Sequence, residues 1–338
     1  MAPPGMCGRG GRIVHGHTLR CHTDAMPQPV IVVVGPTAAG KSELSLRLAR
    51  TLGGEVVNAD SMQLYRGMDI GTAKLPPDQR EGIPHHLLDI WEVTKTASVF
   101  EYQRLARGAI EAIHERGRVP VVVGGSGLYV RAILDNLRFP GTDPALRDQL
   151  EGELAETGAA ALHARLARLD PAAAAAILPS NGRRIVRALE VIELSGQPFS
   201  ARLPGYESIY HATQIGLSVP RAELDQRIAL RVRRMWQAGF VAEVRGLVAA
   251  GLRSGKTASR ALGYAQVLRY LDGEWPEEQA EAETVRATRK FARRQESWFR
   301  RDPRIVWLAA DSGHLAGQAL DTINSCGSPR ATAQETTS

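Results

Sequence analysis

The segment Gly35–Ser42 constrains this chain more than any other part of its sequence. It reads Gly-Pro-Thr-Ala-Ala-Gly-Lys-Ser and matches G-x-x-x-x-G-K-[ST], the phosphate-binding loop (P-loop) of nucleotide-binding and ATP-binding proteins. The loop follows Val30–Val34, an apolar β-branched run typical of a strand buried on both faces. It precedes Glu43–Leu52, which is predicted to be a helix. Because strand, loop and helix occur together, a glycine-rich turn without a ligand is the less favoured interpretation.

The residue types in this loop suit a phosphate ligand. Glycines let backbone N–H groups point at phosphate oxygens, the helix N-terminus adds partial positive charge, and Lys41 adds a full charge. The predicted binding residues are Gly35, Pro36, Thr37, Ala38, Ala39, Gly40, Lys41 and Ser42, with Ser42 as the candidate Mg²⁺ ligand. The run Val123–Gly127 carries no acidic residue where a Walker-B aspartate would lie. We therefore interpret the loop as holding pyrophosphate as a leaving group rather than hydrolysing a nucleotide.

Strand and helix patterns alternate along the first part of the chain, as far as Pro140. Glu55–Asn58 and Val119–Val123 read as further buried strands, and Ser98 begins a capping box for a helix that runs through Ile113. This alternation predicts an α/β fold in which a doubly wound parallel sheet forms a P-loop core.

The second part of the chain is mainly helical. Helical periodicity dominates residues 144–194 and again residues 224–300, while His211–Val219 and Arg304–Leu308 read as strands. The expected segments are an extension at 1–25, a first core part at 26–139, a helical insertion at 140–205, a second core part with C-terminal helices at 206–312, and a tail at 313–338. We expect the extension and the tail to be disordered, and we interpret the extension as an artefact of a start codon placed ahead of Met26.

Asp60 is expected to share one crevice with the predicted P-loop. It comes directly after the strand Glu55–Asn58, and ligands of open parallel sheets gather at the carboxyl ends of the strands. A carboxylate there can take a proton from a nucleophile while Lys41 neutralises the departing phosphates. Position alone leaves a second interpretation equally open, in which Asp60 only caps the following turn.

Charge and cysteine content narrow the classes of protein. The net charge of +6 permits a polyanionic partner without requiring one. The three cysteines lie near the termini without metal-ligand or disulfide spacing, which fits a reducing cytoplasm. No apolar run approaches the length of about 18 residues that a membrane helix needs.

Several blocks of sequence closely resemble those of tRNA dimethylallyltransferases of the bacterial type. They are Gly35–Ser42, Asp60–Tyr65, Gly67–Lys74, Pro84–Asp89, Gly124–Tyr129 and Arg187–Glu190, in the same order and within about residues 28–310. The resemblance implies a prenyltransferase that transfers a dimethylallyl group from dimethylallyl pyrophosphate to N6 of adenosine 37. The implied substrates are tRNAs that read codons beginning with U, bound through the anticodon stem-loop. It also implies Mg²⁺ and a monomeric enzyme.

The same resemblance implies roles for the residues of the site. Asp60 would deprotonate the adenine amine, while Thr37, Lys41 and Ser42 would hold the pyrophosphate and its Mg²⁺. Arg227 and Arg231 lie four apart on one predicted helix face, and the family pattern makes Arg231 the pyrophosphate clamp. Without the resemblance, a solvated basic helix face would be the favoured interpretation of these arginines.

Basic and aromatic surfaces are expected beside the core, because an adenine must leave its stack to react. The residues predicted to contact tRNA are Asp60, Ser61, Met62, Gln63, Ser126, Arg147, Arg183, Arg184, Arg187, Arg260, Gly263, Tyr264, Arg293, Arg294, Gln295 and Arg300. The insertion is thereby interpreted as tRNA-binding. On the last long helix we expect Arg286, Arg289 and Arg293 to form a basic stripe, and Phe291 and Trp298 to form the buried side.

Two positions depart from the family pattern. Ser126 stands where the family usually has Thr, and Ala265 stands where a basic residue is common.

Three other functions explain the sequence less well. A small-molecule kinase would also use a P-loop and an aspartate, but it leaves the basic helices unexplained. An enzyme acting on free adenine nucleotide needs no extended basic surface, and a non-catalytic RNA-binding module does not need both the P-loop and Asp60.

Overall fold

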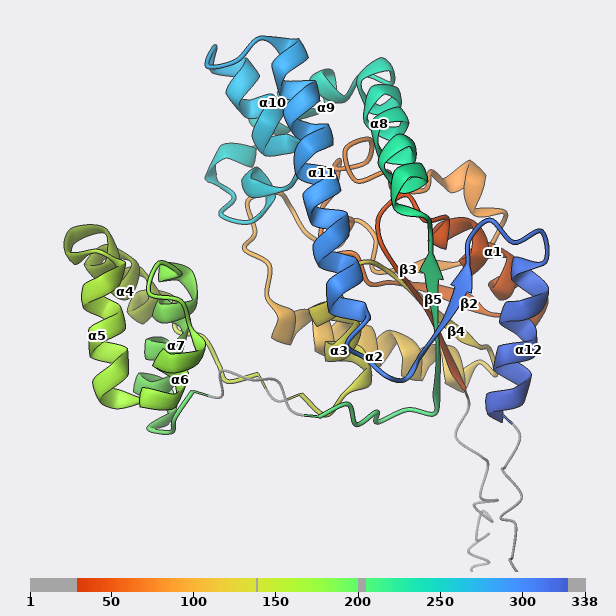
Figure 1. Cartoon of the computed structure of the whole chain (residues 1–338), viewed down its shortest axis with the longest axis horizontal. Helices are drawn as coiled ribbons and strands as arrows, with labels where there is room; N and C mark the ends of the chain where they lie inside the picture. Colours follow the sequence, from red (N-terminus) through yellow and green to blue (C-terminus); the bar gives the residue numbers. More distant parts are fainter. Residues whose placement is uncertain (1–28, 138, 200–204, 328–338) are drawn as a thin grey trace, which may run out of the picture.

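The computed structural model describes residues 29–137, 139–199 and 205–327. At its centre is a six-stranded sheet in the order β3-β2-β4-β1-β5-β6, and every pair of neighbouring strands is parallel (Figure 1). The strands are β1 Val30–Val34, β2 Glu55–Asn58, β3 His85–His86, β4 Pro120–Val123, β5 Ala212–Ser218 and β6 Ile305–Ala309. The predicted parallel α/β core is therefore confirmed, whereas the extension at residues 1–25 lies outside the described residues.

Helices cover both faces of the sheet, which is why β1 and β2 are buried along their whole length. On one face, α1 (Lys41–Leu52) packs through Leu44 and Leu48. On the other face lie α2 (Val99–Glu115) and α3 (Gly127–Leu134). The predicted start of α2 is confirmed, because the Ser98 side chain accepts a hydrogen bond from the N–H of Glu101.

The C-terminal region differs from the expectation of a disordered tail beginning at residue 313. Leu315–Gly327 form the helix α12, which lies beside α1 on the same face of the sheet (Figure 1). Ala319 and Ile323, four residues apart, are its buried positions in that cluster. The expectation is wrong for this helix because a narrow stripe of small and medium residues gives a weak periodic signal. Residues 328–338 lie outside the described part of the chain.

In the part of the insertion that the structure describes, four helices stand to one side of the sheet (Figure 1). They are α4 Pro144–Thr157, α5 Ala159–Leu169, α6 Pro171–Ala176 and α7 Gly182–Ser195. Their apolar side chains, among them Leu150, Leu162, Ile185 and Leu189, form a core separate from that of the sheet. The helical periodicity of this region is confirmed, while the boundaries at 140 and 205 stay a prediction.

The remaining helices are α8 Arg221–Gln237, α9 Phe240–Ala249, α10 Tyr264–Leu271 and α11 Glu277–Phe299. No helix within the described ranges is both long enough and apolar enough to cross a membrane. On α11, the prediction that Phe291 and Trp298 form the buried side is wrong. The buried residues are Ala280, Thr284, Thr288, Ala292, Gln295 and Phe299. Small side chains let neighbouring helices approach this face closely, so the large aromatic residues do not mark the buried side.

Candidate active site

The order of the strands brings three loops to one place. Because β4 lies between β1 and β2, the loop after β4 separates the P-loop from the segment that begins at Asp60. Lys41 and Asp60 line the same cavity, as the sequence predicts. The full lining is Thr37, Lys41, Ser42, Asn58, Asp60, Gln63, Thr72, Ala73, Val123, Gly124, Gly125, Arg231, Phe291 and Gln295.

Glycine is required in the loop after β4 because its neighbours approach closely. A Cβ atom on Gly124 would lie 2.3 Å from the carbonyl oxygen of Ala59, next to Asp60. A Cβ atom on Gly125 would lie 2.2 Å from Nε2 of Gln295. Only a chain without side chains at these positions can pass between the P-loop and Asp60.

The cavity combines two cationic groups with one carboxylate. Burial first, and then the charge of Arg231, lower the pKa of Lys41 to about 8, with Asp60 opposing both effects. Burial likewise lowers the pKa of Arg231, again opposed by Asp60. The Nζ atom of Lys41 donates a 2.7 Å hydrogen bond to the carbonyl oxygen of Pro36, so it lies over the P-loop. The arrangement suits a multiply charged anion.

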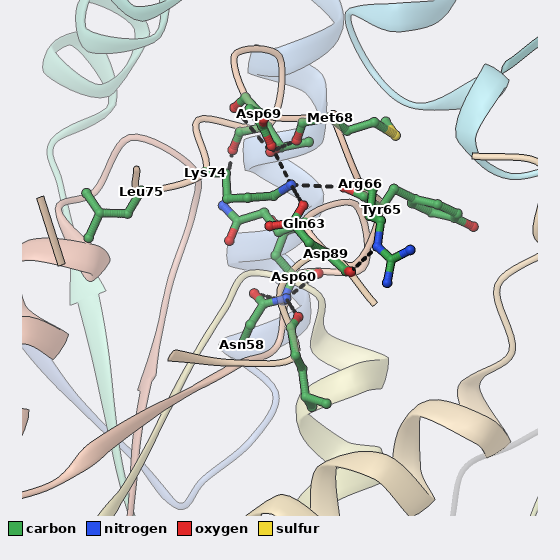
Figure 2. Close-up of polar contacts among 12 residues, drawn as sticks. Asn58, Asp60, Gln63, Tyr65, Arg66, Met68, Asp69, Lys74, Leu75 and Asp89 are labelled. Atoms are coloured by element: carbon green, nitrogen blue, oxygen red, sulfur yellow. Dashed lines mark hydrogen bonds and ion pairs between the residues drawn. The ribbon is translucent and has the colours of Figure 1, made fainter. Parts of the chain in front are cut away.

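Asp60 both caps a turn and presents an oxygen to the cavity, so the two interpretations of this residue coexist. Its Oδ1 accepts a 2.9 Å hydrogen bond from the N–H of Met62. Within the described part of the chain, its Oδ2 accepts no hydrogen bond. The Asn58 side chain holds the backbone of Asp60 by a bond in each direction and also donates to the carbonyl of Leu87 (Figure 2). The carboxylate is thus fixed in place with one acceptor to spare.

Only one of the paired arginines of α8 reaches the cavity. Arg231 lines it and donates a 3.1 Å hydrogen bond to the carbonyl oxygen of Thr72. Arg227 forms an ion pair with Glu223 at 2.5 Å and does not line the cavity. The geometry therefore separates the stronger clamp candidate from the weaker one.

Gln295 has a position that the sequence did not reveal. It is predicted as a tRNA contact, yet its side chain is buried beside the P-loop. Its Oε1 accepts a 2.9 Å hydrogen bond from the N–H of Thr37, and its Nε2 donates a 2.9 Å bond to the carbonyl of Gly125. Phe291, one turn earlier, also lines the cavity. In the sequence, only the helical spacing of the residues that α11 buries could have placed Gln295 and Phe291 at the cavity.

Three residues predicted to contact tRNA lie in the cavity lining or next to it in sequence: Gln63 lines the cavity, Ser61 follows Asp60, and Ser126 follows Gly125. Ser126 accepts a 3.3 Å hydrogen bond from the N–H of Ser61, and the two hydroxyl groups are 3.4 Å apart. Gln63 donates a 3.2 Å bond to the carbonyl oxygen of Thr72. These side chains and that of Met62 are partly exposed, which leaves them accessible to a substrate.

Two predicted tRNA arginines of the insertion already have protein partners. The carboxylate of Glu190 is fully buried and forms ion pairs with both Arg147 and Arg187. Arg187 also donates hydrogen bonds to the carbonyl oxygens of Pro140 and Gly141, at 2.7 and 3.0 Å. Both arginines therefore have a structural role, and their contact with RNA stays a prediction.

Burial contradicts the predicted contact of Tyr264 with tRNA. This side chain is fully buried, and its hydroxyl donates a 2.6 Å hydrogen bond to Oε1 of Glu243. The adjacent Gly263 is buried as well, so its backbone faces other helices. The predicted tRNA arginines that are exposed are Arg183, Arg184, Arg260, Arg293, Arg294 and Arg300. A Gly-Tyr pair followed by a helix carries no signal that distinguishes burial from exposure.

A resident metal centre built by side chains is not found. Within residues 29–137, 139–199 and 205–327, no group of three or more His, Cys, Asp or Glu residues could hold a metal ion. The hydroxyl of Ser42 remains the predicted ligand, exposed at the cavity wall.

Comparison with protein families gives one match over most of the chain. Residues 63–302 match the family described as IPP transferase. The protein named tRNA dimethylallyltransferase from Thermobifida fusca is 68% identical over 299 residues, which cover 87% of this chain and 94% of that relative. Its namesake from Streptomyces coelicolor is 67% identical over 305 residues, which cover 89% and 98%.

Solved structures give the same result. The tRNA isopentenylpyrophosphate transferase of Bacillus halodurans is 40% identical, with a TM-score of 0.67 and coverage of 89% of this chain and 96% of that one. A eukaryotic dimethylallyltransferase described as acting on tRNA is 27% identical, with a TM-score of 0.73 and coverage of 88% and 79%. The similarity therefore spans both the P-loop core and the helices around it.

Proposed function

The chain belongs to the IPP transferase family, and on this premise we propose that it transfers a dimethylallyl group from dimethylallyl pyrophosphate to N6 of adenosine 37 in tRNA. The acceptors are tRNAs that read codons beginning with U. The observation that carries this proposal at the level of the site is one cavity lined by Lys41, Arg231 and Asp60.

The reaction replaces one bond at carbon C1 of the allyl group. The adenine N6 lone pair forms the new C–N bond, and the C1–O bond breaks with its electron pair leaving on pyrophosphate. Asp60 takes the proton that N6 loses, through the oxygen that the turn at Met62 leaves available. Because an adenine amine is a poor nucleophile, stabilisation of the leaving group contributes most to the rate.

The P-loop side of the cavity holds the leaving group. Thr37, Lys41 and Ser42 line the cavity together with Arg231 of α8, and these groups hold the pyrophosphate. Mg²⁺ neutralises charge on the pyrophosphate oxygens when it is bound. The Ser42 hydroxyl fits this ion, because Mg²⁺ commonly takes few protein ligands and completes its shell with phosphate oxygens and water.

The exposed arginines on α11 and at its C-terminal end supply the charge that a tRNA backbone requires. Arg293, Arg294 and Arg300 are the residues assigned to the anticodon stem-loop, together with Ser61, Gln63 and Ser126. The enzyme acts as a monomer in the cytoplasm. Extrusion of the adenine costs a few kcal/mol, which contacts along the stem-loop offset.

Mass analysis of tRNA nucleosides tests the function. Unmodified tRNA incubated with the protein, dimethylallyl pyrophosphate and Mg²⁺ should gain one dimethylallyl group on adenosine 37. A parallel incubation with ATP and small hydroxyl acceptors tests for a kinase. Consumption of ATP without change in the tRNA would overturn the proposal.

A further inference from the structure

The segment Asp69–Lys74 forms part of the cavity wall without carrying any of the groups assigned to the reaction. Thr72 and Ala73 line the cavity directly. The Thr72 carbonyl oxygen accepts hydrogen bonds from Arg231 at 3.1 Å and from Gln63 at 3.2 Å. The position of this carbonyl therefore determines where the guanidinium group of Arg231 lies.

One carboxylate from a distant helix holds the start of this segment. Glu243, on α9, accepts hydrogen bonds from three successive backbone N–H groups. The donors are Asp69 at 3.1 Å, Ile70 at 2.6 Å and Gly71 at 3.2 Å. Successive N–H groups that converge on one anion fix the backbone conformation of a turn. The carboxylate therefore sets the geometry of the chain immediately before Thr72.

The surroundings of Glu243 hold it in turn. The hydroxyl of Tyr264 donates to Oε1 at 2.6 Å, and its pKa is raised, first by burial, so it stays a donor. A Cβ atom on Gly71 would lie 2.2 Å from the ring of Phe240 and 2.6 Å from that of Tyr264. Glycine thus lets the backbone approach two packed aromatic rings and reach the carboxylate.

The far end of the segment has an anchor of its own (Figure 2). The Nζ atom of Lys74 forms ion pairs with Asp69 at 2.6 Å and Asp89 at 2.5 Å, and it donates to the carbonyl of Tyr65 at 2.9 Å. Its side chain is only 3% exposed. Because this anchor does not involve Glu243, loss of the Glu243 carboxylate leaves the segment attached and the fold intact.

We propose that Glu243 is a positioning residue for the reaction, which acts on the pyrophosphate through the turn at Asp69–Gly71 and the Thr72 carbonyl to orient Arg231. This inference rests on the proposed function, in which Arg231 clamps the pyrophosphate. Glu243 itself is not among the residues that line the cavity. Its loss therefore acts mainly on the affinity for dimethylallyl pyrophosphate, through the charged Arg231, and less on the affinity for RNA, through the neutral Gln63.

A double-mutant cycle tests the coupling. Steady-state transfer is measured for the wild type, Glu243→Gln, Arg231→Gln and the double variant, with KM values for dimethylallyl pyrophosphate and for an anticodon stem-loop RNA. Asp272→Asn is the matched control, because it removes a surface ion pair with Arg253 at the end of α10. Tyr264→Phe removes only the hydroxyl that holds the carboxylate. Thermal unfolding is recorded for each protein.

Glu243→Gln should raise the KM for dimethylallyl pyrophosphate about tenfold, as expected for a displaced charged hydrogen-bond donor, with the KM for RNA changed less than about twofold. Tyr264→Phe should raise the KM for dimethylallyl pyrophosphate by a smaller factor, and Asp272→Asn should leave this KM unchanged. In the Arg231→Gln background, Glu243→Gln should add nothing.

The inference is overturned if Glu243→Gln has the same effect in both backgrounds, or if it changes only the melting temperature. Failure of the proposed function gives a different result. In that case Arg231→Gln alone would leave the KM for dimethylallyl pyrophosphate unchanged, or the wild type would transfer no dimethylallyl group.

Discussion

Gln295 and Thr37 are joined by a hydrogen bond between α11 and the P-loop, across 258 positions of sequence. The amide of Gln295 accepts from the Thr37 N–H and donates to Gly125, each at 2.9 Å. It therefore joins the P-loop to the loop after β4, and both loops line the cavity in which the pyrophosphate is proposed to bind.

Replacement of Gln295 by Leu should impair both stability and binding. It leaves the Thr37 N–H and the Gly125 carbonyl without their partner, and each buried unpaired group costs about 1–3 kcal/mol of unfolding free energy. The KM for dimethylallyl pyrophosphate should rise at least about fivefold, since the P-loop loses its support.

Gln103→Leu is the matched control, measured by the same denaturant unfolding and kinetics. Gln103 donates to the carbonyls of Ala132 and Leu137 in a buried position away from the cavity. The Gln103→Leu variant should lose a similar free energy of unfolding, and its KM for dimethylallyl pyrophosphate should be unchanged. Equal changes of KM in both variants would contradict a specific role for Gln295.

Asp60→Asn should reduce kcat by about a thousandfold, the scale of general base catalysis. The asparagine oxygen can still accept from the N–H of Met62, so the turn is kept while the proton acceptor is lost. The dissociation constant for the stem-loop RNA should change no more than a few-fold. Full turnover by this variant, measured as labelled dimethylallyl incorporated into RNA, would refute the base assignment.

The activity should depend on the protonation of Lys41. Its pKa of about 8 means that the ammonium is present below pH 8 and lost as pH rises through that value. We expect kcat/KM for dimethylallyl pyrophosphate to fall by about tenfold per pH unit well above pH 8. Lys41→Arg, which stays charged, should remove this fall, and a profile unchanged by Lys41→Arg would assign the titration to another group.

The lowered pKa of Lys41 also affects the stability of the fold, which should rise with pH where the activity falls. Between about 8 and the ordinary value of 10.5, the unfolded chain binds more protons at Lys41 than the folded chain. The contribution of this group to the free energy of unfolding therefore rises with pH across that window. Comparison of Lys41→Met with the wild type by denaturant unfolding at several pH values isolates it.

Gly124→Ala should lower the free energy of unfolding by about 3 kcal/mol or more, because the new Cβ would collide with backbone. The contact in question is 2.3 Å to the carbonyl oxygen of Ala59. Gly108→Ala is the control in α2, where a Cβ atom meets nothing within 4 Å. That variant should gain about 0.5–1 kcal/mol from helix propensity. Denaturant unfolding that shows equal effects at both sites would contradict the close approach.

The exposed arginines of α11 should contribute to the salt dependence of RNA binding. Arg293→Gln should weaken stem-loop binding and reduce the slope of log affinity against log salt by about 0.7–0.9, the value for one phosphate contact. Arg47→Gln is the control, because it removes an exposed arginine of α1 that pairs with Glu43. It should leave the slope unchanged, and equal slopes for both variants would remove Arg293 from the interface.

Local pattern was sufficient for the part of the site that follows β1 and β2. Val30–Val34 and the P-loop are consecutive in sequence, and parallel strands bring Asp60 to the same edge. The buried face of α11 was not predictable in this way. Its position depends on which helices pack against it, and a basic helix offers several faces of similar polarity.

The role of Glu243 could not be predicted from sequence for a different reason. The partners that link it to the cavity wall are backbone N–H groups, up to 174 positions away, and every non-proline residue has one. Residue identity therefore carries no trace of this contact. Gly71 carries the single trace, because it is the position where the packed rings of Phe240 and Tyr264 exclude a side chain.

The link between Thr37 and Gln295 also has a consequence for protein synthesis. A nascent chain acquires the P-loop, Asp60 and Arg231 long before α11 leaves the ribosome, so every charged group of the cavity exists before its support does. Translation must therefore pass α11 before the walls of the cavity can be joined. A truncated product that stops ahead of α11 would keep the cavity's charges without being a competent catalyst.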